Sequence, residues 1–182
     1  GIEVIVTNPL TGKVLQDGRT GMIEIRGPNV FKGYWGMPKK TAEELRENGF
    51  FITGDLGTIS EDGYVSLVGR SKDLIISGGY NIYPKEIELL LDRVDEVVES
   101  AIIGVPDPDL GEAVVALIVT EHGISLNQDF ILDKLQKKIA RFKHPKQMIF
   151  VRELPRNSMG KVQKNVLRES YKHIFSNKPD TE

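Results

Sequence analysis

The sequence contains no cysteine, and this absence excludes disulfides, thiolate metal sites and cysteine nucleophiles together. Its three histidines, His122, His144 and His173, lie far apart and lack the close spacing of metal ligands. We therefore assign no metal site to the chain. A reducing cytoplasm is the simplest expected location for a protein without cysteine, and the mitochondrial matrix stays open.

Long runs of one residue type are also missing. The net charge is −2 and no long basic run occurs, so we expect no nucleic-acid partner. No apolar stretch has the length of a membrane span, and the first residues, "GIEVIVTNPL", lack the charged and apolar regions of a signal peptide. We expect a globular protein without a membrane partner, and because the chain starts at Gly1 inside an apparent strand, we expect it to be the end of something longer.

The first seventy residues are rich in β-strand patterns. Alternation of apolar and polar residues predicts strands in "IEVIV" and "GMIEIRG", and Asp62-Gly63 between two alternating runs predicts a hairpin. The segment "KKTAEELREN" predicts one helix that begins at Thr41 and ends near Asn48. This part is predicted to be β-barrel-like, a small barrel or curled sheet.

The pattern changes after Arg70. Pro84 suits the first turn of a helix, and further apolar runs alternate with amphipathic segments. Ile131, Leu135, Ile139 and Phe142 fall on one predicted helical face. The order βαββαβα predicts a small α+β domain, in which helices flank a small, mainly antiparallel sheet. The predicted segments are "DLIIS", a helix from Pro84, "VVESAIIGV", "EAVVALIVTE", the helix of Ile131, "QMIFV" and "NVLRESYKHIF".

The glycine pair Gly78-Gly79 lies in "SGGYNIYP", between a strand and a helix start. A backbone phosphate cradle has this general shape. The segment nevertheless matches neither G-x-G-x-x-G nor G-x-x-x-x-G-K-[ST], and "MGKVQ" has Val162 where the latter needs Ser or Thr. Spacing alone favours a turn at the glycine pair and leaves a ligand site open.

Two further polar residues allow more than one interpretation. Asp55 in "FFITGDLG" could order a turn, and it could equally accept hydrogen bonds from a diol. Lys161 lies in "LPRNSMGKVQKN", a loop composition that would hold a lysine out at a tip. Most such lysines are solvated surface residues.

Four segments taken in order closely resemble the carboxyl-terminal part of the adenylate-forming acyl-CoA synthetases, the AMP-binding enzyme family. The motifs are most similar to those of malonyl-CoA synthetases, which convert malonate, ATP and CoA into malonyl-CoA, AMP and pyrophosphate. The resemblance implies an acid-thiol ligase whose cofactors are ATP/AMP, CoA and Mg2+. The four segments are "GPNVFKGYW", "FFITGDLG", "GRSKDLIISGGYNIYPKEIE" and "LPRNSMGKVQKNVLRE".

The same resemblance implies roles for single residues. Asp55 would accept hydrogen bonds from the ribose hydroxyls of the nucleotide, and Arg70 would contact ribose or phosphate. Lys161 would place its ammonium against carboxylate and phosphate oxygens while the acyl-adenylate forms, and thus stabilise developing charge. Gly78 and Gly79 would line the pantetheine tunnel in the second half-reaction, where a Cβ would obstruct the thiol arm.

The resemblance also implies a division of the chain. Residues 1–69 would be the last β-rich subdomain of a large N-terminal domain, 70–73 a hinge with Lys72 at its centre, and 74–182 a mobile lid. The phosphate loop and the adenine and acyl sites would lie upstream, and Mg2+ would be bound mainly through ATP and residues outside this chain. We therefore expect the fragment to be inactive without the missing N-terminal portion of the same enzyme.

Two alternatives remain at this point. A binding or interaction module could keep the lid fold without the chemistry. A synthetase could also act on another short acid, because the acyl pocket would be built by sequence upstream of Gly1. Intact Asp55, Arg70, Gly79 and Lys161 favour an enzyme, since a module without catalysis has no physical need for all four.

Overall fold

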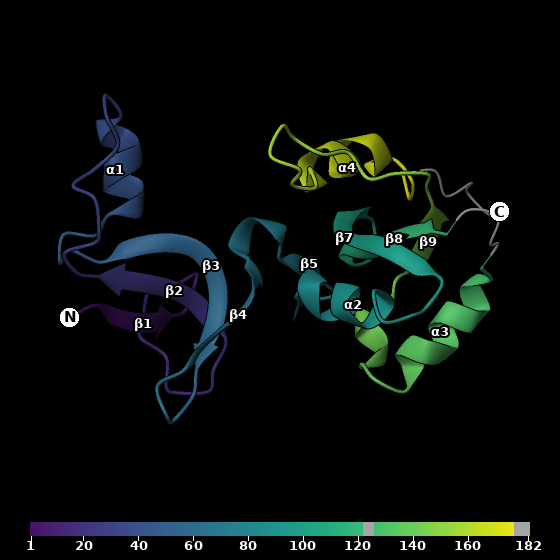
Figure 1. The fold of residues 1–182 in the computed structure, drawn as a ribbon, viewed down its shortest axis with the longest axis horizontal. Helices are drawn as coiled ribbons and strands as arrows, with labels where there is room; N and C mark the ends of the chain where they lie inside the picture. Colours follow the sequence, from purple (N-terminus) through teal and green to yellow (C-terminus); the bar gives the residue numbers. More distant parts are fainter. Residues whose placement is uncertain (122–125, 177–182) are drawn as a thin grey trace. The chain divides into compact units, whose positions relative to one another are not determined.

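The structure is a computed structural model that describes residues 1–121 and 126–176 (Figure 1). The chain divides into two compact units, Gly1–Lys72 and Asp73–Glu182, and each is described by itself. Both units contain a sheet and at least one helix, which confirms the α+β class. None of the helices in the described ranges is long and apolar enough to cross a membrane.

The first unit is built on one four-stranded antiparallel sheet with the order β1-β2-β3-β4. The hairpin between the last two strands turns at Gly63, whose φ of +81° confirms the predicted tight turn. In the described residues β1 and β4 are the two edges of this sheet, so it is open, and of the two predicted forms the small closed barrel is wrong. The strands are β1 (Glu3–Thr7), β2 (Gly21–Arg26), β3 (Phe51–Ile59) and β4 (Val65–Arg70).

The helix of the first unit, α1 (Pro38–Glu44), lies earlier than its predicted bounds. It starts at a proline, which suits a first helical turn because the missing N–H has no helical acceptor there. The prediction that the helix begins at Thr41 and ends near Asn48 is wrong. Leu45 is already extended and forms a bridge with Phe51, which draws the chain out of the helix and into β3.

The second unit contains a five-stranded sheet. Four of its strands lie side by side in the order β6-β5-β8-β7, and the fifth, β9, also pairs with β8. All pairs are antiparallel except β8 with β9. The predicted small, mainly antiparallel sheet is therefore confirmed, with one added strand, β6, that the sequence analysis missed. The strands are β5 (Ile75–Ser77), β6 (Tyr80–Ile82), β7 (Val97–Asp107), β8 (Gly111–Thr120) and β9 (Gln147–Phe150).

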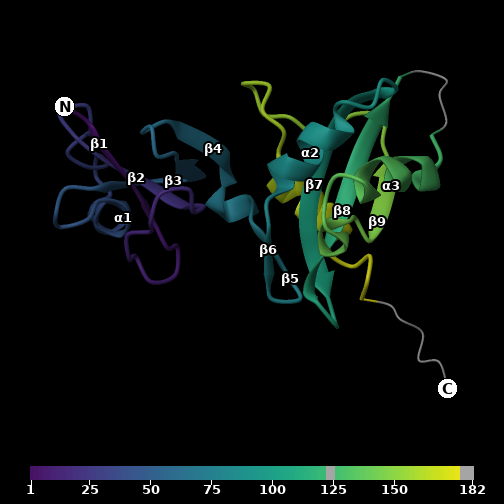
Figure 2. The ribbon, with the colours of Figure 1, turned by 90° about the horizontal axis from the view of Figure 1, so that it is seen from below.

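Helices cover both faces of this sheet. Figures 1 and 2 show α2 (Pro84–Leu91) and α3 (Gln128–Gln136) on one face and α4 (Lys164–Tyr171) on the other. Two apolar clusters match this arrangement, one with Ile87 of α2 and one with Leu167 of α4. Residues 101–105 of β7 and 113–119 of β8 are buried throughout and consist of apolar residues and one glycine, as expected for strands covered on both faces.

The predicted apolar helical face at 131–142 is correct only in its first half. Ile131 and Leu135 lie in α3 and are buried, whereas Ile139 and Phe142 lie beyond its end at Gln136. A short 3-10 turn, Arg141–Lys143, follows, and the chain is then extended at His144 before a proline, a position at which helical torsions are disfavoured. Phe142 instead stacks on Tyr80, with ring centroids 4.6 Å apart.

Candidate functional site

Asp55 and Arg70 face each other across the β3–β4 ladder. The Arg70 Nε lies 2.9 Å from the Asp55 Oδ1, and the two side chains are 53% and 30% exposed. The pair is thus open to solvent, where a ligand can reach it. A carboxylate accepts hydrogen bonds from a diol, and the adjacent guanidinium suits a phosphate or ribose oxygen.

The Asp55 carboxylate projects from an irregularity in the sheet. In the β2–β3 ladder, Met22 pairs with Leu56 and Glu24 pairs with Ile52, so one residue of β2 lies opposite three residues of β3. Gly54 is the middle one of these three and has a φ of +74°. The Thr53 hydroxyl donates to the Ile23 carbonyl at 2.8 Å and accepts from the Asp55 N–H at 3.0 Å. Arg70 Nη1 also donates to the Thr53 carbonyl at 3.2 Å. These bonds fix the position from which the carboxylate extends.

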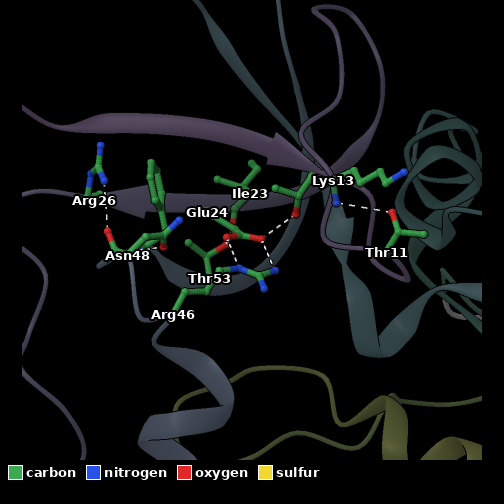
Figure 3. Close-up of polar contacts among 10 residues, drawn as sticks. Thr11, Lys13, Ile23, Glu24, Arg26, Arg46, Asn48 and Thr53 are labelled. Atoms are coloured by element: carbon green, nitrogen blue, oxygen red, sulfur yellow. Dashed lines mark hydrogen bonds and ion pairs between the residues drawn. The ribbon is translucent and has the colours of Figure 1, made fainter.

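Glu24, on β2 beside this irregularity, is fully buried, and Figure 3 shows its carboxylate facing the Arg46 guanidinium. Arg46 donates to both of its oxygens, at 2.5 and 2.6 Å, and the Thr7 hydroxyl donates at 2.6 Å. Burial raises the pKa of Glu24, but the hydrogen bonds from Arg46 and Thr7 outweigh it and hold the pKa below its ordinary value of 4.5. The alternation in "GMIEIRG" predicted a strand but gave no sign that Glu24 is buried, so the sequence analysis missed this pair.

The interval 70–73 contains the boundary between the two units and includes a single 3-10 turn, Ser71–Asp73. On its amino side, Arg70 is held to the first unit by Asp55. On its carboxyl side, Asp73 accepts from Arg168 of α4 at 3.0 Å. Lys72 lies between these two ion pairs and is exposed. Within the part of the chain that the structure describes, Ser71 and Lys72 are the two residues of the interval whose side chains form no such ion pair.

Gly78 and Gly79 form a two-residue turn between β5 and β6. Their φ values are +55° and +82°, the combination that a type I′ hairpin turn requires and that glycine adopts without steric cost. A Cβ on Gly79 would have no atom within 4 Å, so its side is open. The structure thus confirms a turn, and the contact with pantetheine stays a prediction.

Lys161 is exposed at the end of a tightly hydrogen-bonded loop. The Asn157 side chain accepts from the backbone N–H groups of Met159 and Lys161 at 3.0 and 2.9 Å, and the Asn157 N–H donates to the Lys161 carbonyl at 3.0 Å. Arg156 closes the loop by donating to the Gly160 carbonyl at 2.6 Å. Across the described ranges the Lys161 ammonium has neither a hydrogen bond nor an ion pair. The loop therefore presents an unpaired cation on an ordered backbone.

The end of the Lys161 loop is fixed to the core through α4. Lys164, at the start of this helix, donates to the Glu88 carboxylate of α2 at 2.5 Å. Glu88 is buried and also accepts from the backbone N–H of Ile102 on β7 at 2.9 Å. A buried carboxylate with two donors is a firm attachment point, so these contacts hold the loop to the sheet. The sequence analysis did not identify Glu88 or Lys164.

The predicted site residues therefore form one pair and three separate positions. Asp55 and Arg70 are brought together in the first unit. The three separate positions are Lys72, at the end of the first unit, and the Gly78-Gly79 turn and Lys161, both in the second. Among the described residues no group of three or more His, Asp or Glu side chains could hold a metal ion, and His122 lies outside those residues.

Comparisons with known proteins agree with the motifs. Residues 86–161 match the family model "AMP-binding enzyme C-terminal domain". ATP-bound MatB from Rhodopseudomonas palustris is 58% identical with a TM-score of 0.91, over 96% of this chain and 35% of that one. Apo MatB, with the same identity and coverage, gives a TM-score of 0.72. An (octahydro-indenyl)propanoyl:CoA ligase of Rhodococcus jostii is 45% identical over 90% of this chain and 32% of its own length.

The chain spans about a third of the length of these relatives. The family match lies within the second unit, and the similarity to the full relatives continues through the first. Together the matched domain, the identities of 45% and 58% and the high TM-score to MatB establish the family of the sequence. The chain belongs to the AMP-binding acyl-CoA ligase family and contains its C-terminal domain.

Proposed function

We propose that this chain is the carboxyl-terminal part of an ATP-dependent acyl-CoA synthetase that forms an acyl-adenylate and then a CoA thioester, with malonate as the acid. The observation that carries the proposal is the unpaired Lys161 ammonium on its hydrogen-bonded loop. A solvated surface lysine needs no such loop, whereas a lysine that must meet a reacting phosphate does.

In the first half-reaction, a carboxylate oxygen of the acid bonds to the α-phosphorus of ATP and pyrophosphate leaves. Negative charge spreads over the phosphoryl oxygens as the bonds exchange, and the Lys161 ammonium stabilises that charge. Asp55 accepts hydrogen bonds from the ribose hydroxyls, and Arg70 binds a ribose or phosphate oxygen. Mg2+ would be held mainly by ATP and by residues outside this chain, and would neutralise part of the phosphate charge.

In the second half-reaction, the CoA thiol loses its proton, its sulfur bonds to the acyl carbon and AMP leaves. The turn at Gly78 and Gly79 lines the path of the pantetheine arm. Neither glycine has a Cβ that could narrow this path, and the space that a Cβ of Gly79 would occupy is empty.

The two half-reactions need different residues in one site, so we propose that residues 70–73 act as a hinge between residues 1–69 and the lid 74–182. The Asp55–Arg70 and Asp73–Arg168 pairs leave Lys72 between two fixed ends, where a change of backbone torsion breaks neither ion pair.

Support for malonate comes from the motifs, which are most similar to those of malonyl-CoA synthetases. The relatives above include a ligase for a bulky bicyclic acid at 45% identity, so family membership alone leaves the acid open. Two other functions remain testable, a synthetase for another short acid and a lid-like interaction module without catalysis.

The proposed function predicts that the full-length enzyme forms malonyl-CoA faster than any other thioester in a panel of malonate, methylmalonate, acetate and a medium-chain acid. The measurement is CoA thioester formation with ATP and Mg2+ at equal acid concentrations. A different preferred acid would overturn malonate and retain the ligase. No thioester and no acid-dependent pyrophosphate exchange with any acid would favour the interaction module.

Gly79→Leu in the full-length enzyme is expected to slow thioester formation from supplied acyl-adenylate and CoA by about tenfold or more, with adenylate formation changed much less. A leucine would project into the open side of the turn and would also be strained at a φ of +82°.

Gly63→Leu is a matched control for the strain. Gly63 also lies in a hairpin turn, has φ of +81° and has nothing within 4 Å of a Cβ. It should cost similar stability and leave the ratio of the two half-reactions unchanged. If both variants shift that ratio equally, Gly79 does not line the thiol path.

A further inference from the structure

The turn at Gly78 and Gly79 is carried by a very small hairpin. Strands β5 and β6 are three residues each, and the described ladder between β5 and β8 contains a single pair, Ser77 with Gly111. A short two-stranded hairpin is marginally stable at best by itself. The position of the turn therefore depends on contacts outside the regular ladder.

Glu112 on β8 supplies one of these contacts. Its Oε2 accepts from the backbone N–H of Ile76, the middle residue of β5, at 2.8 Å. This side-chain acceptor takes the place of a ladder bond, one residue beyond the Ser77–Gly111 pair. A hydrogen bond to a charged acceptor is stronger than one between neutral groups, so this bond is a substantial part of what fixes β5 to the larger sheet.

Gly104 on β7 makes room for the same carboxylate. A Cβ at this position would lie 2.9 Å from the Glu112 Oε1 and 3.0 Å from the Ile75 Cγ2, both closer than normal contacts. The backbone φ of Gly104 is not positive, so its torsions do not favour glycine. Glycine is needed here because a Cβ would collide with the Glu112 carboxylate. The Glu112 side chain therefore packs across β7, next to the residue that precedes Ile76.

A second carboxylate fixes the other end of the turn. Buried Asp107 accepts from the backbone N–H groups of Asp109 and Leu110 at 3.0 and 3.1 Å, and it forms an ion pair with Lys146. The Leu110 carbonyl, held by this loop, accepts from the Gly78 N–H at 2.9 Å. The glycine turn is therefore held in two ways. Glu112 binds the strand that leads into it, β5, and Asp107 holds the loop whose Leu110 carbonyl binds the Gly78 N–H.

We propose that Glu112 is a positioning residue for the thiol-transfer step: its bond to the Ile76 N–H keeps the Gly78-Gly79 turn where the pantetheine arm must pass. The inference rests on the proposed function for its catalytic part. Glu112 acts through the backbone of β5 and does not contact the reacting atoms. Its effect should therefore fall on the half-reaction that uses the turn.

The test compares Glu112→Ala with Glu112→Gln in the full-length enzyme. Glu112→Ala removes the acceptor and should slow thioester formation from supplied acyl-adenylate and CoA on the order of ten- to a hundredfold, the cost of displacing a positioning group by about an ångström. Adenylate formation, measured as acid-dependent pyrophosphate exchange, should stay within about threefold. Glu112→Gln keeps an oxygen that accepts from Ile76 and should restore most of the rate.

Glu121→Ala, the same exchange in the exposed residue that follows β8, is the control and should change neither step. Equal losses in both half-reactions for Glu112→Ala would overturn the proposal and indicate a general loss of folding. A failure of Glu112→Gln to recover the thiol step would also overturn it, because the bond to the Ile76 N–H would then not be what the step needs.

Amide hydrogen exchange of the peptide covering β5 gives a readout that does not depend on activity. Exchange there should become faster in Glu112→Ala and stay slow in Glu112→Gln and Glu121→Ala. Unchanged exchange in Glu112→Ala would overturn the positioning contact itself. If the unmodified enzyme forms neither adenylate nor thioester, the proposed function fails and the catalytic role of Glu112 fails with it, while the exchange result still decides the contact.

Discussion

Lys161→Ala is expected to slow acyl-adenylate formation by about a hundredfold or more in the full-length enzyme and to leave thioester formation from supplied acyl-adenylate nearly unchanged. Removing one donor to a developing oxyanion in a site closed to water typically costs about 2.7–4 kcal/mol, which corresponds to that factor. The structure gives the reason to expect a clean effect. The Lys161 backbone is held by Asn157, so loss of the side chain removes the ammonium without releasing the loop.

The two half-reactions are measured separately, as pyrophosphate exchange and as CoA consumption with preformed adenylate. Lys138→Ala, at another exposed lysine of the same unit, should leave both rates unchanged. If Lys161→Ala slows both steps equally, Lys161 does not act on adenylation alone, and the proposed hinge motion between the half-reactions is wrong.

Arg46→Met is expected to lower the free energy of unfolding of the first unit by about 3 kcal/mol. Breaking a buried ion pair on one side leaves an uncompensated buried charge, which typically costs about 3–5 kcal/mol. Arg46 is itself 37% exposed, so the low end of that range applies, but Glu24 is fully buried and would retain only the Thr7 hydroxyl. Chemical denaturation followed by a probe in the first unit measures the change.

The cost of Arg46→Met should also depend on pH. The pKa of Glu24 in the folded state lies below 4.5, so its contribution to stability is complete above pH 4.5 and is lost as the pH falls through the folded pKa. The difference between the unmodified protein and the variant should therefore shrink below pH 4.5. Arg19→Met, at an exposed arginine of the same unit, is the control. Equal denaturation midpoints for the two variants would contradict a stabilising role for the pair.

Local patterns predicted most of the strands because alternation and continuous apolar runs depend directly on burial. The β3–β4 hairpin is an example, since Gly63 has the positive φ that its sequence implied. The end of α1 was not predictable in this way. It depends on Leu45 pairing with Phe51, a contact that the helical periodicity of 41–48 does not encode.

The candidate site was likewise predictable only in part from the sequence. The motif resemblance identified Asp55, Arg70 and Lys161, and the structure adds the 2.9 Å pair between the first two. It could not identify Glu24 or Glu112, whose partners are 22 and 36 residues away in the sequence. A carboxylate at an ordinary strand position reveals a buried or supporting role only when the fold brings its donor to it.

The hydrogen bonds of the Lys161 loop have a consequence for conformational entropy. Ordering the backbone of a flexible loop costs about 1–2 kcal/mol for each residue. From Asn157 to Lys161 that cost is already met within the folded protein, because the Asn157 side chain and the Arg156 guanidinium hold the loop without any ligand. Bringing the ammonium to a substrate then restricts one lysine side chain, at most about 2 kcal/mol of rotamer freedom. Lys161 can therefore engage a phosphate and leave it again with little change in the order of the backbone that carries it.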